Sequence, residues 1–165
     1  MSVQTPVLPV SPEHPNNEDI LFVSQGCNGI VDLGASQTVM GEYQLREFLH
    51  DLPDNVRTKV REQKVSMTFR FGNNSTVACD RAILVPVQRY WIRIAIVKSR
   101  TPFLLSNSMF CRLGATIDTK RHTVHFEEIP CTVPLCITDR KLFTLNVSEL
   151  IEKAQKCRSR RDRTK

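Results

Sequence analysis

An acidic residue that directly follows an apolar strand is the first position in this sequence where chemistry is expected. Gly29-Ile30-Val31 forms the predicted strand, Asp32 ends it, and Gly34 follows two residues later. A carboxylate is costly to bury unless a reaction or a hydrogen bond uses it, and a glycine beside it lets another group approach closely. Asp32 is therefore a candidate general acid or base. The alternative is a strand end whose carboxylate accepts turn hydrogen bonds.

Other candidate chemistry in the chain is less specific. His122, His125, Cys131 and Cys136 are spaced as H-x2-H-x5-C-x4-C, which matches no common zinc pattern. Residues three apart on a strand also face opposite sides. No cysteine begins a helix beside a base, and no glycine-rich loop leads into a Lys-Ser/Thr helix start. We therefore expect no metal, no cofactor and no phosphate-loop chemistry.

Length and composition indicate a single globular domain with tails. The chain has 165 residues, of which 41% are hydrophobic and 24% charged, as is typical of soluble domains. No apolar run approaches the roughly 20 residues that span a membrane. Residues 1–19 are rich in Pro, Ser and Asn and lack a signal-peptide pattern, so we expect a disordered leader. The six cysteines are then expected to be reduced, in a cytoplasmic protein without a membrane partner.

The positive charge is concentrated at the C-terminus. The net charge is +6, and the last ten residues carry six basic side chains against Asp162. Residues 1–155 are therefore close to neutral. Such a tail is usually solvated, and weak RNA contact through residues 156–165 is the functional alternative.

Two predicted strands and one predicted helix surround Asp32 in the sequence. Residues 19–23 form a short apolar strand that would pair with the Asp32 strand as a hairpin. Hydrophobic residues at i, i+3, i+4 and i+7 predict a helix over 45–52, which Pro53 ends, with one or two further turns to Val60.

A long hairpin is predicted next. Residues 65–71 alternate between apolar and polar side chains, and the return strand runs over 76–87. The turn between them is Gly72-Asn73-Asn74-Ser75, because glycine and asparagine tolerate positive φ. A third alternating strand covers 92–96.

The second half begins with a fully apolar strand over 102–105. Ser106 is expected to cap a helix that Gly114 ends. Residues 115–118 and 123–126 predict another hairpin, whereas Pro130 and Pro134 predict a loop. A last strand covers 142–147, and Ser148 is expected to cap a short helix carrying Leu150, Ile151 and Ala154. The sum is a mainly β domain with two short helices and a closed or folded-over sheet.

Several of these segments, taken in order, resemble retropepsin-like aspartic proteases, whose motif is Asp-Thr/Ser-Gly-Ala/Ser. The likeness is greatest to protease domains in polyproteins of copia-type retrotransposons and spans residues 20–148. The remaining residues, 149–165, would form the short helix and a basic disordered tail. The matching segments are Val31-Asp32-Leu33-Gly34-Ala35-Ser36, Val39-Met40-Gly41, Phe69-Arg70-Phe71-Gly72, Pro102-Phe103-Leu104-Leu105-Ser106, Leu113-Gly114-Ala115 with Ile117-Asp118, and Val133-Pro134-Leu135.

This resemblance implies a closed or folded acid-protease β-barrel with one lobe per chain, working as a homodimer on an extended peptide of its own polyprotein. Asp32 from each copy would form the catalytic pair. The remaining site residues would be an active-site loop (Leu33, Gly34, Ala35, Ser36), a flap (Phe71, Gly72, Asn73, Asn74, Ser75) and a cleft floor (Leu104, Leu105, Ser106).

Two positions depart from the family pattern. Leu33 stands where the family has Thr or Ser, whose hydroxyl bonds the partner's active-site loop, and Ser106 stands where glycine is frequent. Losing one such bond costs about 1 kcal/mol, which predicts a weaker dimer without removing the carboxylate. Two alternatives remain: the same fold as a weakened or inactive interaction domain, and an RNA-binding module that uses the basic tail.

Overall fold

The computed structural model describes residues 25–71 and 74–163. The expected leader (1–19), the expected strand over 19–23 and two residues of the predicted hairpin turn, Gly72 and Asn73, lie outside the described residues. The described part is mainly β, as predicted from the sequence, and has two sheets. It contains four helices, so the prediction of two short helices is wrong.

The larger sheet has eight strands in the order β10-β11-β1-β6-β2-β5-β4-β3. The strand that ends at Asp32 lies inside it, between β11 and β6. The strands are β1 (Asn28–Asp32), β2 (Val39–Gly41), β3 (Arg61–Arg70), β4 (Thr76–Val87), β5 (Tyr90–Val97), β6 (Leu104–Ser106), β10 (Cys136–Ile137) and β11 (Phe143–Asn146). In the described residues β10 and β3 remain as separate edges, so the prediction of a closed barrel is wrong.

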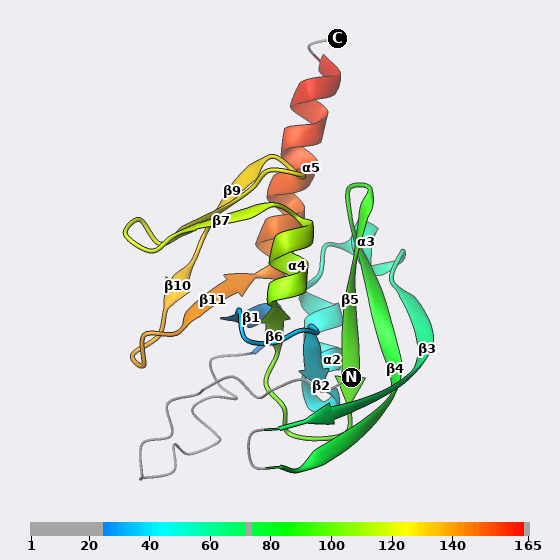
Figure 1. Cartoon of the computed structure of the whole chain (residues 1–165). Coiled ribbons are helices and arrows are strands. Elements are labelled where there is room, and N and C mark those ends of the chain that lie inside the picture. The colour runs from blue at the N-terminus through cyan, green and yellow to red at the C-terminus, as the bar shows by residue number, and fades with distance from the viewer. Residues whose placement is uncertain (1–24, 72–73, 164–165) are drawn as a thin grey trace.

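The predicted long hairpin is confirmed as β3 and β4, which pair antiparallel from Arg61–Leu84 to Arg70–Thr76, with an irregularity between Lys64 and Met67. β3 begins earlier than predicted. The charged residues 61–64, expected to follow helical turns, already pair with β4 because their side chains can remain exposed on the outer strand of the sheet. The hairpin reaches the lower end of the molecule (Figure 1).

The predicted helix after Met40 is present as α2 (Glu42–Asp51), and a four-residue α3 (Asp54–Arg57) follows Pro53. The predicted cap at Ser106 is confirmed: its hydroxyl accepts a hydrogen bond from the Met109 amide at the start of α4 (Asn107–Arg112). Gly114 follows with φ +65°, a conformation that glycine adopts without steric cost.

The smaller sheet contains β7 (Ala115–Asp118), β8 (Thr123–Phe126) and β9 (Cys131–Pro134) in that order. The predicted 115–126 hairpin is therefore confirmed. The loop predicted from Pro130 and Pro134 is wrong, because residues 131–134 form β9. Proline fits there since β9 is an edge strand, where a missing amide donor removes no bond from the interior of the sheet.

The C-terminal helix is longer than predicted. α5 runs from Val147 to Arg163, and the side chain of Asn146, not Ser148, accepts the amide hydrogen bond of Glu149. Its buried stripe ends at Ala154, yet residues 155–163 contain no glycine or proline to break it, and basic side chains favour a helix C-terminus. The described part of the predicted disordered tail is thus helical, and α5 projects beyond the sheets (Figure 1).

Two apolar clusters stabilise this arrangement. The larger joins α2, α4, α5 and both sheets, with Phe48, Phe103 and Phe126 fully buried. The smaller contains Ile30, Ala35, Phe69 and Leu104 and connects the Asp32 segment with the β3–β4 hairpin. Within the described residues, no helix combines the length and apolar character needed to cross a membrane.

Candidate functional site

Asp32 lies at the carboxyl end of β1, opposite Ser106 of the parallel strand β6. Its side chain is only 7% exposed. The carboxylate is held by the turn that follows: Oδ1 accepts a hydrogen bond from the Gly34 amide at 3.1 Å, and the Asp32 carbonyl accepts one from the Ala35 amide at 3.1 Å. The strand end and the turn therefore fix the position of the acid.

The second carboxylate oxygen, Asp32 Oδ2, has no hydrogen-bond partner. Among the described residues three buried side-chain polar atoms lack a partner, and this is the one carboxylate oxygen. A buried polar atom without a partner costs about 1–3 kcal/mol. The single chain thus leaves half of the Asp32 carboxylate unsatisfied.

Burial raises the pKa of the Asp32 carboxyl above its usual range, because removal from water disfavours the charged form. Hydrogen bonding from the amides of Gly34 and Ala35 opposes the shift without cancelling it. The protonated form of Asp32 is therefore favoured relative to an exposed aspartate. A carboxyl group with a raised pKa can donate a proton as well as accept one near its working pH.

The loop beside Asp32 presents apolar surface. Leu33 is 53% exposed, the largest exposed fraction among the exposed large hydrophobic side chains described. Gly34 is also exposed, and a Cβ built on it would touch only Asp32 Oδ1, at 3.4 Å. Its φ lies outside the left-handed region, so neither this backbone nor crowding within the chain requires glycine there.

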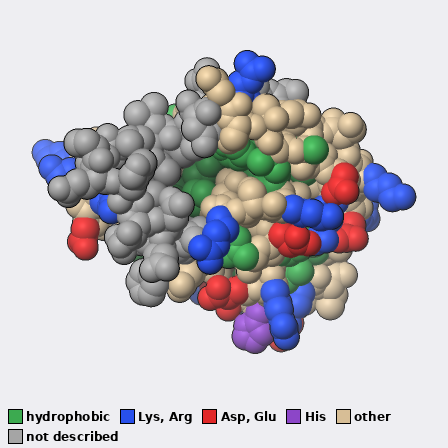
Figure 2. Space-filling model, turned by 90° about the horizontal axis from the view of Figure 1, so that it is seen from below, with side chains coloured by type: hydrophobic (Ala, Val, Ile, Leu, Met, Phe, Trp, Pro, Cys, Tyr) green, Lys and Arg blue, Asp and Glu red, His purple; other side chains and the backbone are tan. Residues whose placement is uncertain are grey.

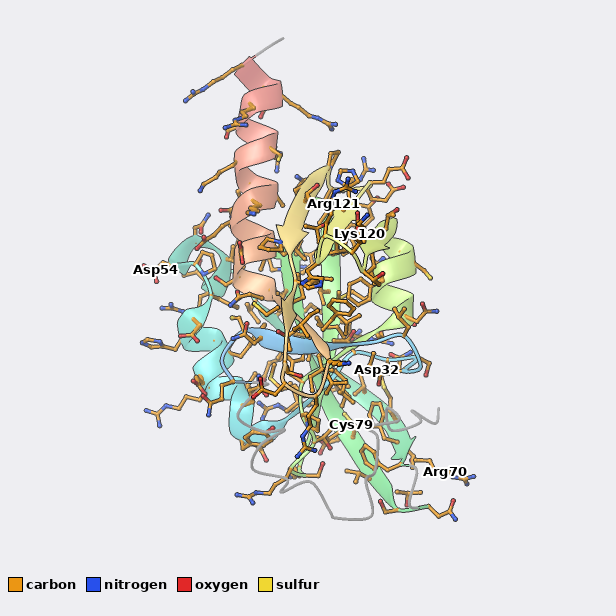
Figure 3. All side chains as sticks on the ribbon, turned by 90° about the vertical axis from the view of Figure 1, so that its left-hand side faces the viewer. Asp32, Asp54, Arg70, Cys79, Lys120 and Arg121 are labelled. Carbon is orange, nitrogen blue, oxygen red and sulfur yellow. The ribbon has the colours of Figure 1, made fainter. Side chains whose placement is uncertain are left out.

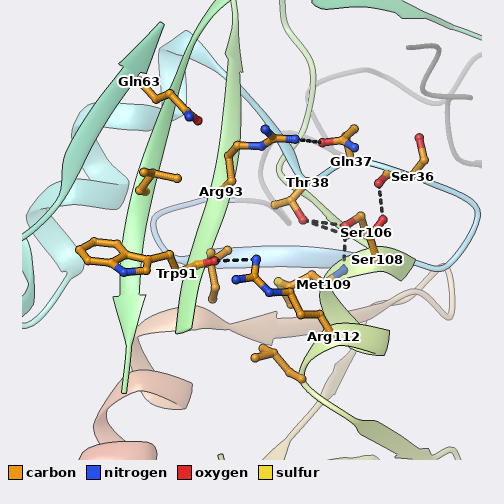
Figure 4. Close-up of a pocket in the computed structure, with 13 residues that line it drawn as sticks. Ser36, Gln37, Thr38, Gln63, Trp91, Arg93, Ser106, Ser108, Met109 and Arg112 are labelled. Atoms are coloured by element: carbon orange, nitrogen blue, oxygen red, sulfur yellow. Dashed lines mark hydrogen bonds between the residues drawn. The ribbon is translucent and has the colours of Figure 1, made fainter. Parts of the chain in front are cut away.

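Polar contacts that no local sequence pattern predicts connect the same loop to α4. The Asn107 amide donates to the Ala35 carbonyl at 3.0 Å, and the Ser108 hydroxyl donates to the Ser36 carbonyl. Thr38 lies in contact with Ser106, and both are buried (Figure 4). A threonine directly before the apolar segment Val39-Met40 was the available signal for this connection.

The expected cleft floor is buried in the single chain. Leu104 and Leu105 are completely inaccessible and Ser106 is 2% exposed. The three residues form β6 and support β1 through parallel pairing. They therefore position Asp32, and none of them presents a surface to a peptide in one copy.

The expected flap residues that the structure describes, Phe71, Asn74 and Ser75, lie at the end of the β3–β4 hairpin. The Phe71 amide donates to the Ser75 carbonyl at 2.9 Å, and the Asn74 amide donates to the Phe71 carbonyl at 2.9 Å. Asn74 has φ +62°, as predicted for this turn. Arg70 points away from the body at the hairpin end, and Asp32 lies in the middle of the molecule (Figure 3).

The inner side of this hairpin packs against the segment that carries Asp32. Phe69 is fully buried and Cys79 is 3% exposed, in the same cluster as Ile30 and Ala35. Phe71 and Val77 lie partly buried at its margin. Seen from below, hydrophobic side chains gather in the middle of this end of the molecule, with charged residues around them (Figure 2).

The histidines and cysteines whose spacing was compared with zinc patterns do not form a cluster in the structure. His122 packs edge-on against Phe143, and His125 Nδ1 is 2.9 Å from the hydroxyl of Thr132. Within residues 25–71 and 74–163, no three His, Cys, Asp or Glu side chains lie together as metal ligands would.

No protein-family model matches the chain, and no curated protein matches it at a significant level. The functional conclusion therefore depends on the geometry around Asp32.

Proposed function

We propose that two copies of this chain form a retropepsin-like aspartic endopeptidase, with one Asp32 from each copy in the catalytic pair. The observation that supports this proposal is the buried, unpartnered Asp32 Oδ2 beside an exposed turn. A second carboxyl group could share a proton with that oxygen and remove the unsatisfied position. One chain supplies one such acid at this position, so the pair requires a twofold axis.

The chemistry follows from the proximity of two acids. Two carboxylates about 3 Å apart cannot both ionise, so the pair holds one proton and titrates as a unit. The charged member removes a proton from a water molecule, which attacks the peptide carbonyl. The protonated member polarises that carbonyl and later donates its proton to the leaving amine. Burial of Asp32, which already favours its protonated form, suits it to this role.

Leu33 and Gly34 meet the partner in this proposal. Since a Cβ at position 34 would find only Asp32 Oδ1 nearby, the glycine is explained by the close approach of a second loop. Leu33 contributes apolar surface but cannot supply the hydroxyl bond of a threonine. The dimer is then weaker by about 1 kcal/mol for each bond lost.

The β3–β4 hairpin is the element suited to cover a bound peptide. Its inner face packs on Ile30 and Ala35 beside Asp32, and Phe71 and Val77 extend that apolar face toward the turn. An extended peptide held beneath it would pair its main chain with the hairpin and be shielded from water. The substrate class is an unfolded segment, in the first instance the polyprotein that carries the domain.

Cleavage of an unfolded protein tests the proposal. Reduced, alkylated casein is incubated with the purified chain between about pH 4 and pH 7 in high salt, which favours apolar association, and new amino termini are counted. Asp32→Asn should abolish cleavage, and a pepstatin-type inhibitor should block it. Asp54→Asn is the matched control, because Asp54 is an exposed acid on α3 paired with Arg57. A native dimer that cleaves nothing would favour the alternative of an inactive interaction domain.

The shape of α5 favours a second candidate function, weak RNA binding through residues 156–165. In the described part, Lys156, Arg158, Arg160, Arg161 and Arg163 are all exposed on a helix that projects from the body. The buried stripe of α5 ends at Ala154, so the projecting turns lack the apolar face that insertion into a lipid surface requires. Phosphate contact by basic side chains remains as the binding mode.

A further inference from the structure

A pocket of about 500 Å³ lies next to the Asp32 loop without including Asp32 itself. One wall comes from the loop and α4, with Ser36, Gln37, Ser108 and Arg112, and the opposite wall comes from the β3–β4–β5 face (Figure 4). This volume falls within the range of small-molecule and peptide side-chain sites.

The charged groups of the pocket have one sign. Arg93 and Arg112 line it, and no aspartate or glutamate does. Arg93 donates to the Gln37 side chain at 3.0 Å, and Arg112 donates to the Trp91 carbonyl at 3.3 Å. Neither guanidinium pairs with a carboxylate in the part of the chain that the structure describes. Because a guanidinium carries five N–H donors, both retain donors for an anion.

The remaining lining is apolar or neutral. Leu84, Ile92, Met109 and Leu113 line the pocket beside the two guanidinium groups, and Trp91 adds its indole ring. The guanidinium of Arg61 lies 4.7 Å from the centre of that ring, which holds the ring in a cation–π contact. A bare inorganic anion would leave this apolar surface unused. A peptide that carries acidic and aliphatic side chains would use both parts.

We propose that the pocket between Arg93 and Arg112 binds an extended acidic peptide, with glutamate or aspartate side chains on the two guanidinium groups and an aliphatic side chain against Trp91 and Leu84. Asp32 does not line this pocket, although Ser36 and Ser106 of the proposed active-site region do, so peptide binding here does not require the Asp32 carboxylate. The pocket would select protein partners or substrates by an acidic segment outside the position of any cleavage.

Trp91 gives a direct readout, since it is the one tryptophan of the chain. The Asp32→Asn variant is titrated with a capped hexapeptide of alternating leucine and glutamate, and the emission of Trp91 is followed. We expect a saturable change that weakens as salt rises. Arg93→Gln and Arg112→Gln should each weaken binding about tenfold. Arg46→Gln, an exposed arginine of α2 outside the pocket, should bind like the parent.

Any of three results with the peptides would overturn the proposal: no saturable change with the acidic peptide, equal binding of the same peptide with glutamine in place of glutamate, or unchanged affinity in Arg93→Gln. Inorganic phosphate is titrated in parallel, and equally tight binding of phosphate would show a simple anion site instead. Using Asp32→Asn separates the two proposals, because peptide binding should persist in a chain that cannot cleave. Thermal unfolding confirms that each variant is folded. If Arg112→Gln does not fold, Arg93→Gln alone tests the proposal.

Discussion

Thr38 and Ser106 are 68 positions apart in the chain, yet their hydroxyl oxygens lie 3.0 Å apart in a buried hydrogen bond. The Thr38 hydroxyl also accepts a hydrogen bond from the Ser106 amide at 3.1 Å, while the Ser106 hydroxyl caps α4. The pair thus joins the loop after Asp32 to the helix beneath it. Ser106 therefore supports both the loop after Asp32 and the start of α4.

Replacing Thr38 with valine should lower the free energy of unfolding by about 1–3 kcal/mol, because the Ser106 amide would be left buried without a partner. Valine preserves the branched shape, so the change isolates the hydroxyl. Urea unfolding measures the loss. Thr38→Ser is the control, which keeps the hydroxyl and should cost less than Thr38→Val. Equal stability of Thr38→Val and the native chain would show that this bond supports nothing.

The raised pKa of Asp32 predicts a pH-dependent cost to the folded single chain. Below the ordinary value of about 3.8, Asp32 is protonated in both the folded and unfolded states and contributes no pH dependence. As the pH rises above that value, the unfolded chain releases the proton first, so the native state binds more protons and its stability falls. The loss is complete once the pH exceeds the raised pKa.

Asp32→Asn removes this titration. The difference in unfolding free energy between the variant and the native chain should therefore move in favour of the variant as the pH rises from about 3.5 to 7. Thermal unfolding at low protein concentration, where the single chain dominates, provides the measurement. A difference that stays constant, or moves toward the native chain, would contradict the raised pKa.

Leu33→Thr should strengthen the proposed dimer. A threonine hydroxyl from each copy can bond across the twofold axis, and two such bonds of about 1 kcal/mol each lower the dimer dissociation constant about thirtyfold. Sedimentation equilibrium measures that constant, and the cleavage rate per chain should rise as the constant falls. Tyr43→Thr, at another exposed hydrophobic position, should change neither. If Leu33→Thr also changes neither, Leu33 is not at the dimer contact.

Deleting residues 156–165 should abolish RNA binding and leave the fold intact, because the buried stripe of α5 ends at Ala154. For about four phosphate contacts, the affinity of the full chain for single-stranded RNA should fall with salt at a log–log slope of about −3. Filter binding over a salt series tests both points. A Lys120→Gln/Arg121→Gln chain, altered at the β7–β8 turn, should bind normally. If the chain still binds RNA after the deletion, α5 is not the RNA-binding element.

Local signals in the sequence were sufficient for the β3–β4 and β7–β8 hairpins and for one helix cap. Alternating side chains over 65–71 and the glycine–asparagine turn predicted β3 and β4, and Ser106 predicted the start of α4. These features depend on neighbouring residues, whose periodicity and turn chemistry can be read directly. The position of Asp32 at the end of an apolar strand was predicted on the same basis.

The wrong predictions concern contacts between residues that lie far apart in the chain. Periodicity shows which faces of a strand are buried but not which strand lies beside it, so the open order of the larger sheet and the parallel pairing of β1 with β6 were not predictable. The sequence predicts a loop at Pro134, because the place of this proline on an edge strand depends on pairing with β8. Thr38 was missed because its partner, Ser106, is 68 positions away.

Mixing native and Asp32→Asn chains is the most direct test of a site shared between two copies. The two are combined at constant total concentration, equilibrated, and assayed for cleavage of unfolded casein. If each active unit needs Asp32 from both chains, an equal mixture should retain about one quarter of the activity, since random pairing makes about one quarter of the dimers fully native. Activity that falls in proportion to the native fraction, to about one half, would show that a single chain acts alone and would contradict the shared site.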